Sequence, residues 1–157
     1  MLKYSVGLDV SSSDIYACFS AIDLHQRVKV ISSKVINNDL KGFDFLIAWI
    51  EKCRKIKDIP LVIGMEATGI YHEECAYYLH DKKYAVSVVL PNYAKKYLQA
   101  SGLKSKNDKI DAKGLAQMFA ERSFRLWEPM GKFYYQLRGL TRQQESLQEI
   151  KTGFKNQ

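Results

Sequence analysis

The sequence predicts an α/β fold: a mixed five-stranded sheet flanked by helices, followed by a C-terminal helical arm. Two observations support this prediction. Three β-rich runs follow one another closely near the N-terminus, before any helical pattern begins. Two further apolar runs then alternate with segments of helical periodicity. Strands joined by short turns pair antiparallel, whereas strands joined by helices usually pair parallel, so the sheet is expected to be mixed.

The first three strands are predicted at Tyr4–Val10, Ile15–Ile22 and Arg27–Ile36. The residues between the first two, Ser11–Asp14, have the composition of a turn. Because the three runs lie so close together in the chain, an antiparallel meander is the expected arrangement.

The next elements are predicted in the order helix, strand, helix, strand, helix, helix. Asn38 or Asp39 can cap the first of these helices. Pro91 stops the last strand, and Gly102 ends the short helix that follows it. The six ranges are Leu40–Lys55, Leu61–Glu66, Tyr71–Lys82, Ala85–Leu90, Asn92–Ala100 and Asp108–Arg122.

Pro129 and Gly131 mark a boundary, so residues 1–128 are predicted to form one domain and residues 129–157 a helical arm. The arm has an amphipathic pattern that needs a partner. It packs either on its own domain or against a second copy, as the heptad spacing of Leu140 and Leu147 suggests; two heptads are too few to decide. The apolar residues of the arm are Phe133, Leu137, Leu140, Leu147, Ile150 and Phe154.

The amino-acid composition limits the classes of protein to which the chain can belong. The chain has 157 residues, 46% of them hydrophobic, and a net charge of +7, which fits a packed domain that favours anionic partners. Cys18, Cys53 and Cys75 are odd in number and far apart, as in reduced intracellular proteins. The N-terminus has no signal-peptide pattern, and no apolar run approaches 18 residues. We therefore expect a cytoplasmic protein without a membrane segment.

Four acidic residues stand at informative places. Asp9 lies in the first predicted strand and Glu66 ends the fourth, while Asp108 and Asp111 lie three residues apart at the start of a helix. That spacing puts Asp108 and Asp111 on one face of the helix. In a sheet of this order the first and fourth strands can be neighbours, which would bring Asp9 close to Glu66 at the end where α/β sheets commonly bind ligands.

This acidic set predicts a divalent-metal site. Carboxylate oxygens are hard ligands that suit Mg²⁺ or Mn²⁺. Two such ions, about 4 Å apart, can stabilise both the attacking and the leaving oxygen of a phosphodiester. Without a cation, four clustered carboxylates would repel one another. Any one of these acids taken alone could instead be a helix cap or a turn residue. The four together favour metal binding.

Lysines and tyrosines gather around the helical acids. Lysines act as point charges on phosphates, and tyrosines stack on unpaired bases. The alternative is a solvated face whose tyrosines cover the core. We expect nucleic-acid contact, with either DNA or RNA, at Lys95, Lys96, Lys104, Lys106, Lys109, Lys113, Tyr93 and Tyr97.

Four motifs occur in a specific order: Val6–Val10, Gly64–Tyr71, Leu90–Asn92 and Lys106–Ala112. Together they resemble the N-terminal DEDD domain of the insertion-sequence transposases related to the Piv and MooV DNA invertases, over about residues 4–128. The resemblance implies a ribonuclease-H-like, RuvC-like fold. It also implies that the DEDD metal ligands are Asp9, Glu66, Asp108 and Asp111.

Members of that family are recombinases that act on DNA with help from a guide RNA, work as multimers, and carry a second domain with a serine nucleophile. The resemblance therefore implies the metal-binding half of a DNA transposase or site-specific recombinase, with oligomerisation through residues 132–157. The sequence departs from the family pattern at Ser11–Ser12, where many members carry a lysine, and at Asn107, where threonine or serine is usual. It also stops at Gln157, before a serine domain.

Parts of the sequence also fit two other functions. The chain could be a module that holds guide RNA or DNA without turnover, which nuclease assays against metal-free controls would separate from an enzyme. It could also be an actin-like ATPase or sugar kinase, because Gly7–Ser13 resembles the first phosphate loop of those proteins. The second, glycine-rich phosphate loop that they need is missing, so this class is disfavoured.

Overall fold

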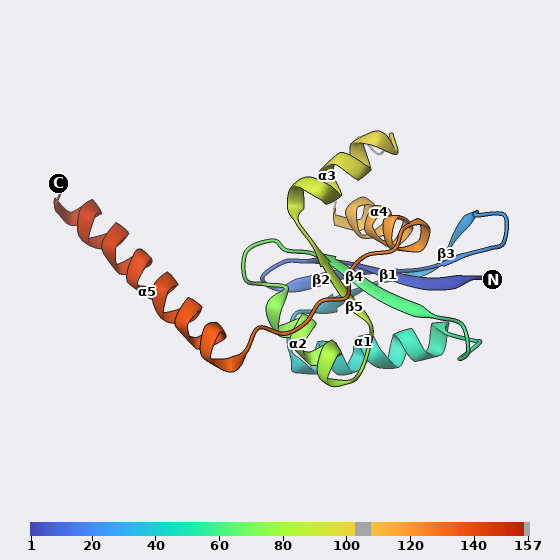
Figure 1. The fold of residues 1–157 in the computed structure, drawn as a ribbon, viewed down its shortest axis with the longest axis horizontal. Coiled ribbons are helices and arrows are strands. Elements are labelled where there is room, and N and C mark those ends of the chain that lie inside the picture. Colours follow the sequence, from blue (N-terminus) through green and yellow to red (C-terminus); the bar gives the residue numbers. More distant parts are fainter. Residues whose placement is uncertain (103–107, 156–157) are drawn as a thin grey trace. The chain divides into compact units, whose positions relative to one another are not determined.

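The five predicted strands form one mixed sheet in the computed structural model of the protein (Figure 1). Their order across the sheet is β3-β2-β1-β4-β5; β1, β2 and β3 pair antiparallel, and β4 pairs parallel with both β1 and β5. The structure describes residues 1–102 and 108–155, without the side chains of residues 108–110, 132 and 155. The strands are β1 (Lys3–Val10), β2 (Asp14–Ile22), β3 (Val28–Asn37), β4 (Leu61–Glu66) and β5 (Val86–Val89).

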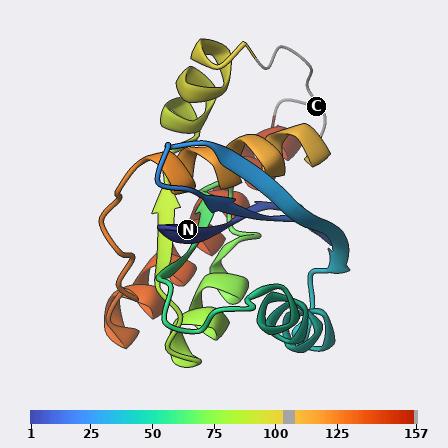
Figure 2. The same ribbon diagram turned by 90° about the vertical axis from the view of Figure 1, so that its right-hand side faces the viewer.

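Helices cover both faces of the sheet, as Figures 1 and 2 show. One face carries α1 (Leu40–Cys53) and α2 (Glu73–Asp81), and the other carries α4 (Asp108–Glu121), with α3 (Pro91–Ala100) beside α4. The predicted cap of α1 is confirmed, because the side chain of Asp39 accepts a hydrogen bond from the Gly42 amide at 2.7 Å. The mixed five-stranded sheet with helices on its faces, predicted from the sequence, is confirmed.

The two faces of the sheet are packed differently. On the α1 side the core is built from large side chains, such as Phe19, whose ring meets that of Trp49 edge to face. On the α4 side the residues against the middle of the sheet are small: Cys18 of β2 packs on Ala112 and Ala116. Small side chains allow a helix to approach a sheet closely.

Two glycines make this approach possible. Gly7 of β1 and Gly64 of β4 are direct partners across the parallel pair. A Cβ atom on Gly7 would lie 2.2 Å from the backbone nitrogen of Ala116, and one on Gly64 would lie 1.9 Å from the ring of Phe119. The hydroxyl of Ser5 adds a hydrogen bond of 2.8 Å to the Ala116 carbonyl. The position of α4 on the sheet therefore depends on the absence of both Cβ atoms.

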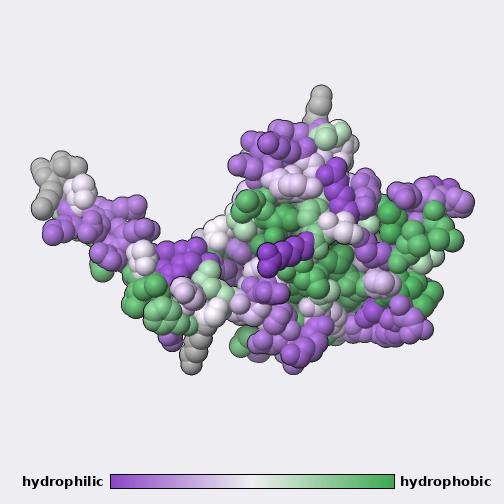
Figure 3. Space-filling model, in the orientation of Figure 1, coloured by the Kyte–Doolittle hydropathy of each residue, from purple (hydrophilic) through white to green (hydrophobic). Residues whose placement is uncertain are grey.

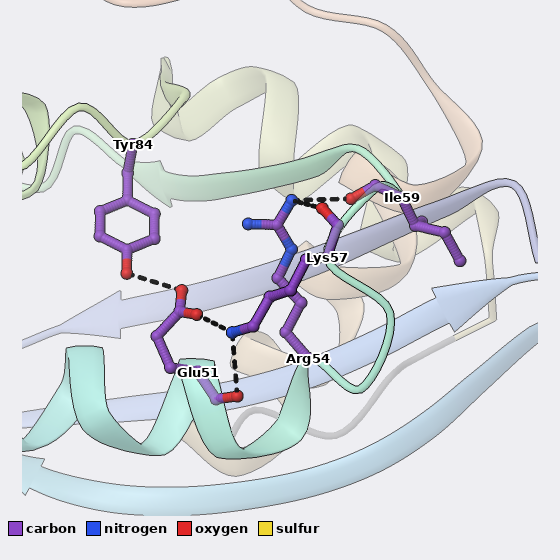
Figure 4. A network of polar contacts seen from close by, with 5 residues as sticks. All are labelled: Glu51, Arg54, Lys57, Ile59 and Tyr84. Carbon is purple, nitrogen blue, oxygen red and sulfur yellow. Dashed lines mark hydrogen bonds and ion pairs between the residues drawn. The ribbon is translucent and has the colours of Figure 1, made fainter.

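A polar network closes the loop between α1 and β4 (Figure 4). Glu51 forms an ion pair with Lys57 and accepts a hydrogen bond of 2.8 Å from the Tyr84 hydroxyl. Arg54 donates to the carbonyls of Lys57 and Ile59, at 2.6 and 2.9 Å. The hydrogen bond from Lys57, the largest cause, lowers the pKa of Glu51, while burial and Glu51 raise the pKa of Tyr84 to about 12.

The chain divides into two compact units, Met1–Trp127 and Glu128–Gln157. The second contains α5 (Lys132–Lys155). Figure 3 shows hydrophobic and hydrophilic residues interspersed along this helix. Within the described part of the chain, no helix has the length and apolar character needed to cross a bilayer. The exposed apolar residues of α5 include Phe133, Leu137, Leu140, Leu147, Ile150 and Phe154.

Candidate metal centre

Asp9 and Glu66 lie side by side at the carboxyl ends of two neighbouring strands. Leu8 of β1 pairs with Met65 of β4, and each acid is the next residue of its strand. Gly7, two residues before Asp9, faces α4, and so does Gly64, two residues before Glu66. Because side chains two residues apart in a strand share a face, both acids project to the α4 side. The predicted adjacency of the first and fourth strands is confirmed.

Asp111 reaches the same place from α4. It is close enough to Glu66 that its negative charge helps to raise the pKa of that carboxyl group. Asp108 is the first residue of α4, but its side chain lies outside the described residues. Among the side chains that are described, no three potential ligands are close enough to form a metal site by themselves. The four-acid site remains a prediction.

The environment of Glu66 suits a cation. Burial, the largest cause, and the nearby Asp111 both raise its pKa above the usual value of 4.5, whereas the Thr68 hydroxyl, which donates to Oε1 at 3.0 Å, lowers it. A partly buried carboxylate beside a second negative charge is stabilised by a bound positive ion. Oxygen-only donors of this kind fit a hard divalent ion such as Mg²⁺ or Mn²⁺.

Three residues of the site were not predicted from the sequence. Thr68 supports the ionised form of Glu66, and Gly7 and Gly64 allow α4 to approach. The sequence does hold a signal for the glycines, because each stands two residues before an acid at the end of a strand.

The predicted nucleic-acid residues fall into three groups. Lys95 and Lys96 of α3 and Lys113 of α4 are exposed, and Figure 3 shows hydrophilic residues gathered over α3. Lys104 and Lys106 lie outside the described residues, as does the side chain of Lys109. The two tyrosines, Tyr93 and Tyr97, form the third group.

These tyrosines differ in exposure. Tyr93 is 43% exposed, and its hydroxyl accepts a hydrogen bond of 3.0 Å from Arg122, a cation that was not among the predicted residues. Tyr97 is 7% exposed and donates to Glu121 at 2.6 Å; burial, the largest cause, and Glu121 raise its pKa to about 12. The ring of Tyr97 is thus engaged inside the protein, and only Tyr93 offers a face to a base.

Solved structures of Holliday junction resolvases share this fold. Thermus thermophilus RuvC aligns with a TM-score of 0.52 and 11% identity, over 73% of this chain and 91% of its own. The fowlpox virus Holliday junction resolvase gives a TM-score of 0.51 and 10% identity, over 75% of this chain and 97% of its own. At these identities the likeness concerns the fold, and it confirms the predicted RuvC-like, ribonuclease-H-like architecture.

Sequence comparison gives the family. The profile of the transposase family DEDD_Tnp_IS110 matches residues 6–157. The pilin gene-inverting proteins of Moraxella bovis and Moraxella lacunata are 31% and 30% identical to the chain over 145 residues, which cover 92% of this chain and 43% of each relative. The chain therefore belongs to the IS110 family of DEDD transposases, as the motifs predicted. It spans less than half the length of these relatives.

Proposed function

We propose that the chain is the metal-binding catalytic domain of a DNA transposase or site-specific recombinase. Its ligands would be Asp9, Glu66, Asp108 and Asp111, holding one or two Mg²⁺ or Mn²⁺ ions. The observation that carries this proposal is the electrostatic coupling of Glu66 and Asp111, two acids from separate elements, beside the strand position of Asp9.

Each element has a part in the proposed chemistry. The parallel pair of β1 and β4 fixes the backbone of Asp9 and Glu66, and α4 carries Asp111 to them across the two glycines. Thr68 helps to keep Glu66 ionised, as a ligand must be. When bound, a divalent ion supplies positive charge that orients the scissile phosphate and stabilises its oxygens.

The basic residues around α3 and α4 would bind the nucleic-acid backbone, either the DNA substrate or a guide RNA. Exposed Lys95, Lys96 and Lys113 support this proposal, since neutralised phosphates dominate such affinity. Replacing Lys95 and Lys96 with glutamine should reduce the salt slope of binding by about 1.8, at roughly 0.9 per phosphate contact. The same change at Lys41 and Lys52 of α1, on the opposite face of the sheet, is the control and should leave the slope unchanged.

The enzymatic role is tested by incubating labelled branched and single-stranded DNA with the protein in Mn²⁺ and in EDTA. We expect metal-dependent strand cleavage by the wild type and by Asp23→Asn, a control in the β2–β3 turn, and none by Asp9→Asn. Asp23 is paired with Arg27 at 3.1 Å and lies at the other end of β2 from the acids.

A second candidate is a nucleic-acid-binding module that has no turnover alone. The observation that favours it is the coverage, because the chain spans 43% of its curated relatives. Metal-dependent binding of DNA without cleavage, lost in Asp9→Asn, would support this candidate over the first.

We also propose that α5 joins copies of the protein. Its exposed apolar residues, among them Leu140 and Leu147, support this, because an amphipathic helix requires a partner surface. Sedimentation should show oligomers of the wild type and a monomer when both leucines are replaced with lysine. Monomeric wild type across the micromolar range would contradict it.

A further inference from the structure

A hollow of about 250 Å³ opens beside the acids, between β2, β3 and α4. It is smaller than the pockets that hold drug-sized ligands, which span roughly 300–1,000 Å³. A single planar ring is the kind of group that such a volume admits. The residues that line it are Tyr16, Ala17, Ser33, Lys34, Val35 and Ala112.

The hollow lies next to the candidate metal centre. Tyr16 is the direct cross-strand partner of Asp9, and Ala112 is the residue after Asp111. Directly opposed residues of antiparallel strands have Cα atoms about 4.5–5.5 Å apart, and their side chains share a face. The wall of the hollow is therefore made by the immediate neighbours of two of the four acids.

The residues that line the hollow have the chemistry of a binding site for a nucleobase. The Tyr16 ring packs with Cys18, Ala112 and Ala116, which hold it in place. Val35, 55% exposed, pairs with Tyr16 across the strands and offers apolar surface, while Ser33 offers a hydroxyl. An aromatic ring takes a base by stacking, whatever its identity, and a hydroxyl can bond its edge.

We infer that this hollow binds one unpaired base of the DNA strand, from the nucleotide next to the phosphate held at the acids. The inference rests on the proposed function. Holding that base would fix which phosphate reaches Asp9, Glu66 and Asp111, so the hollow determines where along the strand the enzyme cuts.

The first test compares two tryptophan substitutions on the same edge strand. Val35→Trp fills the hollow. Val30→Trp is the matched control, because Val30 is also exposed but pairs with Ser20, four residues farther along β2. Tyr16→Ala removes the stacking ring without adding bulk, and therefore checks the result independently of any packing change caused by tryptophan.

The readout is the affinity of each protein, in Ca²⁺, for single-stranded oligothymidylate and for the same oligonucleotide with abasic sites. We expect Val35→Trp and Tyr16→Ala to weaken binding of oligothymidylate by about tenfold, within the range for one stacked base. Val30→Trp should bind as the wild type does, and the abasic oligonucleotide should bind all four proteins equally. Irradiation of an oligonucleotide containing 5-iodouracil should cross-link the base to Tyr16.

A Mn²⁺ titration of the same proteins separates this inference from the proposed function. Suppose that the wild type binds Mn²⁺ but both hollow variants bind oligothymidylate as tightly as the wild type. Then the inference that the hollow binds a base is wrong, and the proposed metal site is retained. If the wild type does not bind Mn²⁺ at all, the proposed function fails first. An oligomer that dissociates only in Val35→Trp would make the hollow a contact between copies and overturn the inference.

Discussion

Two glutamates near opposite ends of β4, Glu51 in α1 and Glu66 in the strand itself, have opposite surroundings. Glu51 lies by the loop that enters the strand, where a hydrogen bond from Lys57 lowers its pKa and Tyr84 donates a second bond. Glu66 ends the strand, where burial and the charge of Asp111 raise its pKa. The ionised form of a glutamate is thus stabilised at Glu51 and destabilised at Glu66.

The difference indicates which carboxylate has a structural role. Glu51 receives its cation from the protein itself, and the resulting network closes a loop. Within the described part of the chain, the pKa of Glu66 is set by burial, by the Thr68 hydroxyl and by the charge of Asp111. None of these supplies a positive charge. A partly buried negative charge beside a second negative charge destabilises the folded protein, unless a bound cation neutralises it. The comparison therefore supports the proposal that a cation binds at the Glu66 end.

The largest expected effect on stability and metal binding comes from pushing α4 away from the sheet, because the close contact of α4 with the sheet brings Asp111 to Glu66. Gly7→Ala would force the backbone of α4 away, since its Cβ would lie 2.3 Å from the Ala112 carbonyl oxygen. We expect a loss of about 3 kcal/mol in the free energy of unfolding, at the upper end for overpacking, together with loss of Mn²⁺ binding.

Urea unfolding followed by circular dichroism measures this loss. Gly139→Ala in α5 is the control, because nothing lies within 4 Å of its added methyl group. That variant should be as stable as the wild type or slightly more so. A Gly7→Ala protein that keeps full stability and metal binding would contradict the role given to the glycine pair.

The next effect is stabilisation by metal. Mn²⁺ at 100 times its dissociation constant should stabilise the wild type by about 2.7 kcal/mol, which raises Tm by roughly 5–10 °C in a chain of this size. Glu66→Gln should lose this increase, whereas Glu51→Gln should keep it. Thermal melts with and without Mn²⁺ give the result, and an equal increase in all three proteins would argue against a site at Glu66.

A smaller effect is expected from Thr68→Val. Without the hydroxyl hydrogen bond, which lowers the pKa of Glu66, that pKa should rise further, and protons should compete better with the metal. We expect about tenfold weaker Mn²⁺ binding at pH 6, the usual size of a loss in an outer-shell contact. Thr141→Val in α5, whose hydroxyl bonds the Leu137 carbonyl, is the matched control. Equal affinity of the Thr68 variant at pH 6 would show that the hydroxyl has no influence on the site.

The smallest effect is the pH dependence of the metal-free protein. The pKa of Glu66 is raised, so its contribution to stability is complete below 4.5 and is lost as pH rises through its folded-state pKa. The pKa of Glu51 is lowered, so its contribution is present above 4.5 and is lost as pH falls through its folded-state pKa. At pH 7, Glu66→Gln should therefore stabilise and Glu51→Gln destabilise.

Each change should be under about 1 kcal/mol, because solvent screens both groups. Denaturation at pH 4 and pH 7 tests the signs: the gain in Glu66→Gln should disappear at pH 4. The same sign for both variants at pH 7 would remove the contrast between the two ends of β4.

Much of the fold was predictable because its strands are strongly patterned. The fourth strand, Leu61–Glu66, was predicted with the observed bounds, since Pro60 precedes a continuous apolar run. Helix ends were less accurate. The helix predicted from Tyr71 begins at Glu73, where no side chain caps it, and α3 begins at Pro91, as the fixed φ of proline allows at a first helical position.

The site was only partly predictable, because it depends on register and on contacts distant in the chain. The positions of Asp9 and Glu66 follow from strand order, which the pattern predicts. That Gly7 pairs with Gly64 under α4 depends on the register of two strands. That Tyr97 is buried against Glu121, while Tyr93 is exposed, depends on how α3 packs on α4, and helical periodicity alone does not distinguish them.

The most direct test of the metal site is a calorimetric titration of Mn²⁺ into the wild type, Asp9→Asn and Glu51→Gln. We expect saturable binding in the wild type and in Glu51→Gln, and none in Asp9→Asn. Binding that is unchanged in Asp9→Asn, or lost only in Glu51→Gln, would contradict the claim that the carboxyl ends of β1 and β4 hold the metal.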